Sequence, residues 1–321
     1  MSKLVIGIDI GGTNTRLGIV NEDGEILNES SFSTSAYDEI DDYRKALQDH
    51  AAQLIKYADD RGIGKIAGIG IGAPNGNYYN GSIEDAPNLR WKGTLPLAKN
   101  MEDHFNITCR LTNDANAAAL GEMLFGSAKD YKDFIVITLG TGLGSGIVVG
   151  GQMVYGHDGF AGEVGHSTAV YGGRQCACGR KGCLETYASA TGIKRTVAEL
   201  LANSIEPSSL RKIPFNALDA RVIFEEAQKG DSIAMQAFEF TGDMLGRALA
   251  NAVVYTSPEA IILMGGLAEA GKLILDPTKK SMEENVLNLY RGKVKLSVSS
   301  LKAHNTALLG AAAIVWQEPA S

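Results

Sequence analysis

Apolar positions in this chain occur in two patterns, short uninterrupted runs and longer stretches with helical spacing. The short runs end in glycines or turn residues and predict buried strands, whereas apolar residues every three or four positions predict helices. Strands are predicted at residues 4–10, 15–20, 25–32, 65–72, 107–111, 134–139, 147–149, 153–155, 260–264 and 294–298. Helices are predicted at residues 37–57, 115–124, 189–202, 219–229, 231–256 and 307–316, with a loop-rich region at 74–91. This alternation favours an α/β protein.

One series of elements occurs twice. A strand, a Gly/Thr turn, a second strand, another turn and a third strand open the chain, and the same series starts again at residue 134. Gly140 stands 129 residues after Gly11, with apolar strands on both sides of each. Such self-similarity indicates internal duplication, and two openings of this kind predict two α/β domains.

The first Gly/Thr turn has the composition of a phosphate-binding loop. Gly11 and Gly12 are expected to turn backbone N–H groups toward an anion, and Thr13 adds a hydroxyl donor. Asp9 suits a Mg²⁺ ion held through water, which Mg²⁺ is reluctant to lose. An ordinary tight hairpin is the alternative.

The second Gly/Thr loop, at residues 140–146, lacks the G-x-G-x-x-G spacing of dinucleotide-binding turns, because Ser145 stands where glycine is required. Two Gly/Thr hairpins that face each other across a cleft are instead the phosphate-binding arrangement of actin- and hexokinase-like ATPases. A third element, residues 263–267, ends a strand at Gly265 and Gly266 and could pack on an adenine.

Three of the four cysteines, Cys176, Cys178 and Cys183, lie within eight positions, and His166 precedes the first by ten residues. Three thiolates and one imidazole make a complete tetrahedral zinc set, so the metal would be structural. It would hold the neighbouring Glu163 and Glu185 in place. The alternative is a glycine-rich loop that happens to contain cysteines.

Composition narrows the possible partners. The chain of 321 residues carries a net charge of −7, which argues against nucleic acid as its main partner. Its four cysteines do not form a disulfide framework, so we expect a cytoplasmic protein. No apolar run approaches the length of a membrane span, and Asp9 interrupts the N-terminal run too early for a signal peptide.

Taken together, these motifs resemble the ROK family of sugar kinases and repressors, most closely its glucokinases, over essentially the whole chain. The resemblance rests on residues 9–16, 68–75, 112–117, 140–146, 163–166 and 176–185 and on the glycines at 265 and 266. It implies a two-domain actin/hexokinase-like (ribonuclease H-like) ATPase fold with the active site in a cleft between the domains. We expect a small domain at 1–112 plus about 302–321, and a large domain at 113–301 that carries the zinc loop.

The resemblance also implies roles for individual residues. Asp114 would be the catalytic base, since a sugar hydroxyl needs a nearby carboxylate to take its proton; the alternative is that Asp114 only caps a helix. The implied sugar contacts are Asn88, Asn113, Asp114, Glu163, His166 and Glu185. The implied ATP and Mg²⁺ contacts are Asp9, Gly11, Gly12, Thr13, Arg16, Gly140, Thr141, Gly142, Gly265 and Gly266. The zinc ligands would be His166, Cys176, Cys178 and Cys183.

We therefore expect an ATP-dependent hexose kinase that acts on the 6-hydroxyl of glucose, with N-acetylmannosamine, allose or fructose as alternative substrates. A sugar-sensing repressor of the same family is less favoured, because Asp9 lies too close to the start of the chain for a preceding DNA-binding segment. An actin-like ATPase without a sugar site would leave the Glu163–His166 and cysteine motifs unexplained. A homodimer or homotetramer is expected from the resemblance.

Overall fold

The computed structural model describes residues 3–301 and 303–317. Its first sheet has the strand order β3-β2-β1-β4-β8. Strands β1 and β2 are antiparallel, as are β2 and β3, whereas β4 and β8 run parallel to β1. The strands are β1 (Lys3–Ile10), β2 (Asn14–Val20), β3 (Ile26–Ser33), β4 (Lys65–Ala73) and β8 (Cys109–Asn113).

The second sheet repeats this arrangement with the order β11-β10-β9-β12-β13. Strands β11, β10 and β9 are antiparallel neighbours, and β12 and β13 run parallel to β9. The strands are β9 (Phe134–Leu139), β10 (Leu143–Val149), β11 (Gln152–Met153), β12 (Ala260–Met264) and β13 (Lys295–Val298). The shared topology agrees with the repeat seen in the sequence.

Alternate positions of β1 explain how helices cover both faces of the first sheet. Leu4, Ile6 and Ile8 pack into the same core as α1 (Ile40–Arg61) and α2 (Leu97–Phe105). Val5 points the other way and packs with α8 (Ala303–Trp316). A fully buried aliphatic side chain contributes about 1.5–3 kcal/mol relative to an exposed one, so both faces stabilise the sheet.

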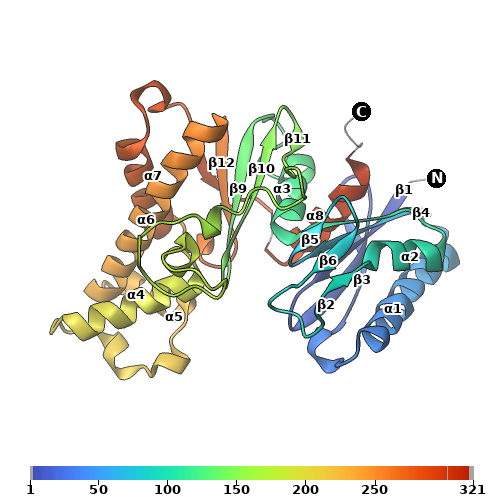
Figure 1. The fold of residues 1–321 in the computed structure, drawn as a ribbon, viewed down its shortest axis with the longest axis horizontal. Coiled ribbons are helices and arrows are strands. Elements are labelled where there is room, and N and C mark those ends of the chain that lie inside the picture. Colours follow the sequence, from blue (N-terminus) through green and yellow to red (C-terminus); the bar gives the residue numbers. More distant parts are fainter. Residues whose placement is uncertain (1–2, 302, 318–321) are drawn as a thin grey trace.

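Glycines in β1 and β4 let the backbone of α8 lie directly on the first sheet. A Cβ atom at Gly7 would lie 2.3 Å from the carbonyl oxygen of Leu308, and one at Gly70 would lie 1.9 Å from that of Ala311. Neither position can carry a side chain without moving the helix. The last helix therefore packs against the first sheet, and α3 (Asp114–Phe125) crosses it between the two sheets (Figure 1).

The helices of the second half lie away from the first sheet (Figure 1). They are α4 (Ala190–Asn203), α5 (Ala220–Gln228), α6 (Ser232–Thr256) and α7 (Lys272–Asn285). A Cβ atom at Gly242 of α6 would lie 2.6 Å from the ring of Pro277 in α7, so this glycine gives the proline its space. Across the described part of the chain, no helix has the length and apolarity needed to cross a membrane.

Five features of the structure differ from the sequence prediction. The sequence prediction missed α2, which is short, and α7, which contains a proline that usually ends a helix. The region predicted as loop-rich holds a small sheet of β5 (Gly76–Asn77), β6 (Ser82–Glu84) and β7 (Thr94–Leu95). Strand β10 begins at Leu143 rather than at residue 147, and β11 is shorter than predicted.

Candidate active site

A cavity of about 280 Å³ lies between the two halves of the molecule. The first sheet contributes Asp9 near the end of β1 and Gly72 near the end of β4, and α3 contributes Asp114. The second sheet contributes Thr138 near the end of β9 and Gly265 just after β12. Residues that are far apart in sequence meet here because parallel strands end at the same edge of a sheet.

Both aspartates in this cavity hold a proton more tightly than an aspartate in water. Burial, and to a smaller extent the charge of Asp114, raise the pKa of Asp9 to about 6, whereas the charge of Arg16 opposes this shift. Asp114 is open to solvent through the cavity. The protein around its carboxylate displaces water and so raises its pKa, whereas the hydrogen bond from Ala115 N lowers it. Perturbed carboxylates that converge on one cavity mark it as the candidate active site.

Asn113, rather than Asp114, caps α3. Asn113 Oδ1 accepts hydrogen bonds from Ala115 N at 2.7 Å and from Asn116 N at 3.3 Å, which are the bonds of a helix N-cap. Asp114 is the first residue of the helix and bonds only the neighbouring Ala115 N, at 2.8 Å. The cap of α3 is therefore Asn113 and not Asp114, and it uses the Asn113 amide oxygen rather than the amide nitrogen.

The first glycine loop uses its N–H groups differently from the prediction. Gly11 N donates to Asn14 O at 3.0 Å and closes the turn, so the prediction that it faces an anion is wrong. Within residues 3–301 and 303–317, Gly12 N and Thr13 N have no recorded hydrogen bond, so they are the donors available to a phosphate. A Cβ atom at Gly12 would lie 2.6 Å from Asn88 O, which brings the predicted sugar residue against this loop.

The second glycine loop closes in a similar way. Gly140 N donates to Gly142 O at 3.1 Å, and Gly140 O accepts from Ala190 N at 2.9 Å. The loop is therefore limited to residues 140–142, and the glycines at 144 and 146 belong to β10, where α3 packs closely over them. Phosphate binding by Thr141 and Gly142 stays a prediction, whereas Gly140 N already has a backbone partner.

Arg16 lies opposite Asp9 across the β1–β2 pair, so both side chains are on the same face of the sheet. Arg16 Nη2 bonds Glu29 on β3 at 2.8 Å. The arginine thus sits between two carboxylates and lowers the pKa of Asp9, which opposes the effect of burial.

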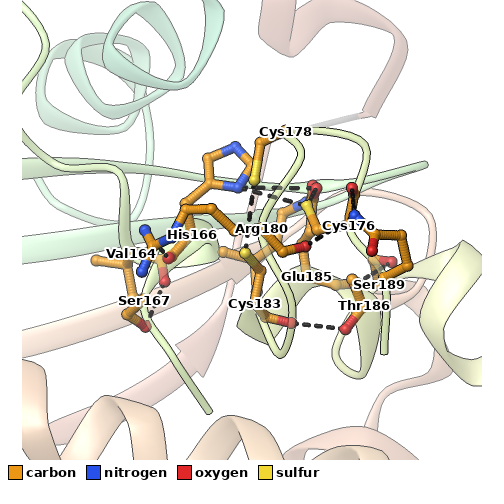
Figure 2. A network of polar contacts seen from close by, with 12 residues as sticks. Val164, His166, Ser167, Cys176, Cys178, Arg180, Cys183, Glu185, Thr186 and Ser189 are labelled. Carbon is orange, nitrogen blue, oxygen red and sulfur yellow. Dashed lines mark hydrogen bonds and ion pairs between the residues drawn. The ribbon is translucent and has the colours of Figure 1, made fainter. Parts of the chain in front are cut away.

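The four predicted metal ligands converge at one point (Figure 2). The donor atoms of His166, Cys176, Cys178 and Cys183 all lie within 4.8 Å of one another. Cys178 Sγ and Cys183 Sγ are 3.6 Å apart, and Cys176 Sγ lies 3.8 Å from His166 Nδ1. Zinc–sulfur bonds of about 2.3 Å in a tetrahedron give edges of about 3.8 Å, so this donor set fits zinc.

Two glutamates lie beside the cysteine cluster. Glu185 Oε1 lies 3.0 Å from Cys176 Sγ, and Glu185 Oε2 accepts from Leu143 N, at the end of the second glycine loop, at 3.4 Å. The loss of surrounding water raises the pKa of Glu163, His166 lowers it, and the charges of Asp114 and Glu185 raise it. Glu163, His166 and Glu185 therefore form one electrostatic group with Asp114.

A family model described as "ROK family" matches residues 5–318 of the chain. The chain belongs to the ROK family. It is 33% identical over 320 residues to a glucokinase of Halalkalibacterium halodurans, covering 98% of this chain and 95% of the relative. It is also 32% identical to a putative xylose repressor of Caldicellulosiruptor, covering 97% of this chain and 78% of the relative.

Among solved structures, this ROK protein is similar to a ROK family glucokinase from Streptomyces griseus in complex with glucose and AMPPNP. The TM-score is 0.81 at 32% identity, covering 97% of this chain and 98% of the other. The fold is thus the two-lobed α/β fold of actin- and hexokinase-like proteins, as expected from the resemblance.

A second cavity, of about 750 Å³, contains residues that the sequence reasoning missed. It is lined by Gly140, Thr141 and Gly266, which the sequence prediction assigned to ATP, and also by Asp219, Arg221, Phe224 and Gln228 around α5. Glu269 lines both cavities and so marks where they meet. The sequence predicted α5 as a helix but gave no sign that it belongs to a site, because its residues match no motif and reach the glycine loops only through the packing of the second half.

Proposed function

We propose that this protein is an ATP-dependent hexose kinase that transfers the γ-phosphoryl group to the 6-hydroxyl of glucose. Glucokinases and repressors both occur among its ROK relatives, and the former support a sugar kinase. The observation that carries the proposal is Asp114, a carboxylate with a raised pKa in a cavity that Asp9 and Gly265 also line. A pure sugar sensor has no need for a base beside a phosphate loop.

The larger cavity suits the nucleoside of ATP. Its wall combines the apolar side chains of Phe224 and Leu267 with the open backbone at Gly266, where a flat base can pack. The phosphates would then run past Thr141 and Gly142 toward Gly12 and Thr13. The solved relative in complex with AMPPNP supports ATP as the donor.

Asp9 is the residue that would hold Mg²⁺, through water, and the ion would neutralise charge on the phosphates. The donor chemistry fits, because an oxygen ligand with a pKa of about 6 is largely ionised at neutral pH. Arg16, on the same face, keeps this carboxylate from losing its charge altogether.

In the proposed reaction Asp114 accepts the proton of the sugar 6-hydroxyl. The freed oxygen forms a bond to the γ-phosphorus, the bond from that phosphorus to the bridging oxygen breaks, and ADP leaves with the electron pair. A raised pKa makes Asp114 a stronger base than an ordinary aspartate. Exclusion of water by closing of the two lobes would limit ATP hydrolysis.

The proposed sugar contacts are Asn88, Asn113, Asp114, Glu163, His166 and Glu185. Glu163 and Glu185 would accept bonds from the hydroxyls at C1 and C2, and Asn113 and Asp114 would hold the end that carries C4 and C6. The zinc would fix Glu163 and Glu185 through His166 and Cys183. Galactose should be a poor substrate, because its axial 4-hydroxyl leaves a polar group of the site without a partner.

A panel of hexoses tests the substrate. ADP release should be fastest with glucose, by kcat/KM, and slow with galactose. If N-acetylmannosamine exceeded glucose by more than about tenfold, the assignment to glucose would be wrong and only the kinase class would remain. Sugar binding without any sugar-dependent ADP release would favour a repressor-like sensor instead.

A further inference from the structure

Arg174 is a largely buried arginine next to the cysteine cluster that neither the zinc set nor the cavity uses. Its side chain is only 9% exposed, whereas arginines are normally at the surface. It begins the cysteine loop, defined here as residues 174–183, which ends at the ligand Cys183. A buried guanidinium is costly unless each of its donors is satisfied, so its contacts indicate a role.

The Arg174 guanidinium is satisfied on every side. Nε and Nη2 form a two-pronged bond to Glu199 of α4, at 2.9 and 2.6 Å. Nη1 donates to Thr186 O at 2.7 Å and to Gly192 O at 3.2 Å. Nη2 also donates to Thr196 Oγ1 at 3.0 Å. The side chain therefore ties the start of the cysteine loop to α4 and to the residue that follows Glu185.

The backbone and the ring contacts of Arg174 act on the same segment. Its carbonyl oxygen accepts from Gly182 N at 2.8 Å, which joins the two ends of the cysteine loop. Its N–H donates to Tyr187 Oη at 2.9 Å, and its guanidinium carbon lies 4.5 Å from the centre of the Tyr187 ring. A cation over an aromatic ring at this distance is attracted to it.

These contacts place Glu185 between two anchors of different chemistry. The metal ligand Cys183 precedes it by two residues, and Thr186, bonded by Arg174, follows it directly (Figure 2 shows Cys183, Glu185 and Thr186). We propose that Arg174 is a positioning residue for Glu185 and fixes this carboxylate for the sugar independently of zinc. This inference rests on the proposed role of Glu185 in hexose binding.

Arg174→Gln in the full-length protein tests the proposal, with zinc content and the dissociation constants of glucose and AMPPNP measured together. We expect about one zinc per chain to remain, the glucose Kd to rise about tenfold, and the AMPPNP Kd to stay within about twofold. Glucose affinity falls because a displaced carboxylate no longer meets the sugar hydroxyls, while the nucleotide cavity has no contact with Arg174.

Arg195→Gln is the matched control. Arg195 lies on α4 and bonds the cysteine loop through one hydrogen bond, from Nη1 to Gln175 O at 2.9 Å. We expect its glucose Kd to stay within about twofold of that of the unaltered protein. Arg174→Lys keeps the charge but lacks the planar fork, so it should lie between Arg174→Gln and the unaltered protein.

Two results would overturn the inference. One is an unchanged glucose Kd in Arg174→Gln; the other is a loss of zinc that accounts for the whole loss of glucose affinity. If Arg174→Gln does not fold, Glu199→Gln removes the charge that pairs with the guanidinium, and it should raise the glucose Kd with zinc retained. Failure of the unaltered protein to bind glucose would instead reject the proposed substrate itself.

Discussion

The two sheets share one strand order but differ at the position that faces the cavity. Asp9 stands two residues before Gly11, and Thr138 stands two residues before Gly140. Both residues line the same cavity. Asp9 is a carboxylate with a pKa raised to about 6, whereas Thr138 is neutral and its hydroxyl accepts from Gly144 N at 3.1 Å.

This difference indicates how a repeated scaffold can divide the work of a phosphoryl-transfer site. Both aspartates of the cavity come from the first half, at the end of β1 and just after β8. The second half supplies backbone donors and a hydroxyl at the corresponding point. A carboxylate on both sides would repel a triphosphate, because like charges in a partly buried site interact strongly.

The largest effect is expected from removing the proposed base, Asp114, from the first half. Asp114→Asn should keep the fold and bind glucose, but lower kcat by about 10²–10⁴-fold, since only proton acceptance is lost. Steady-state ADP release and glucose calorimetry give the two numbers. Turnover within about tenfold of the unaltered protein would show that another group accepts the proton.

The second half contributes no aspartate to the lining of the smaller cavity but carries the cluster of His166 and three cysteines. Cys178→Ser should lose the zinc and weaken glucose binding by about tenfold, because the segment that carries Glu185 loses one anchor. Metal analysis and calorimetry measure both effects. The control is Cys109→Ala, at the buried cysteine outside the cluster, which should retain one zinc per chain. Equal zinc loss in both variants would show that the cluster is not the zinc site.

The variants Asp9→Asn and Thr138→Val compare the two halves by how their stability depends on pH. The pKa of Asp9 is raised from 3.8 to about 6, so the folded protein binds a proton more tightly there than the unfolded chain does. The free energy of unfolding therefore falls as pH rises from about 4 to about 6. Above about pH 6, the folded protein bears the full cost of a charged, buried Asp9. Without Mg²⁺ or ATP, Asp9→Asn should be about 2 kcal/mol more stable than the parent at pH 8, and equal to it near pH 4.

Thr138→Val is the neutral counterpart. It should lose about 1 kcal/mol, through the broken bond from Gly144 N, to the same extent at both pH values. Denaturant unfolding at pH 4 and pH 8 measures both variants. If the stability gained by Asp9→Asn did not depend on pH, burial and the charge of Asp114 would not be raising the pKa of this carboxylate.

The two glycine loops give the smallest contrast. A Cβ atom at Gly12 would lie 2.6 Å from Asn88 O, whereas none of the described atoms lies within 4 Å of one at Gly140. Gly12→Ala should therefore cost about 1–3 kcal/mol, and Gly140→Ala less than about 0.5 kcal/mol, in ligand-free unfolding. Equal costs would show that the loops need glycine for the same reason.

Local chemistry explains which parts of the site the sequence predicted. The cysteine cluster was predictable because all four ligands lie within 18 positions of each other, and the glycine loops because they directly follow apolar strands. The repeat predicted the common topology of the two sheets. Asp114 could be named from its motif, but its capping neighbour Asn113 could be assigned only from hydrogen-bond geometry.

The missed features depend on long-range packing. The larger cavity needs α5, which reaches the second glycine loop only when the second half folds. Arg174 appears in the sequence as an ordinary loop arginine, and its importance comes from Glu199, which lies 25 residues away. Helix α7 was missed because its proline is tolerated only where Gly242 makes room for the ring.

The position of the transferred phosphate tests the central claim most directly. Purified protein incubated with glucose, ATP and Mg²⁺ should yield one phosphate per ADP on the sugar, and phosphorus–proton NMR should show it on the 6-oxygen. That result is what Asp114 beside the two glycine loops predicts. A phosphate on any other oxygen, or ADP formed with free phosphate and no sugar phosphate, would contradict the account.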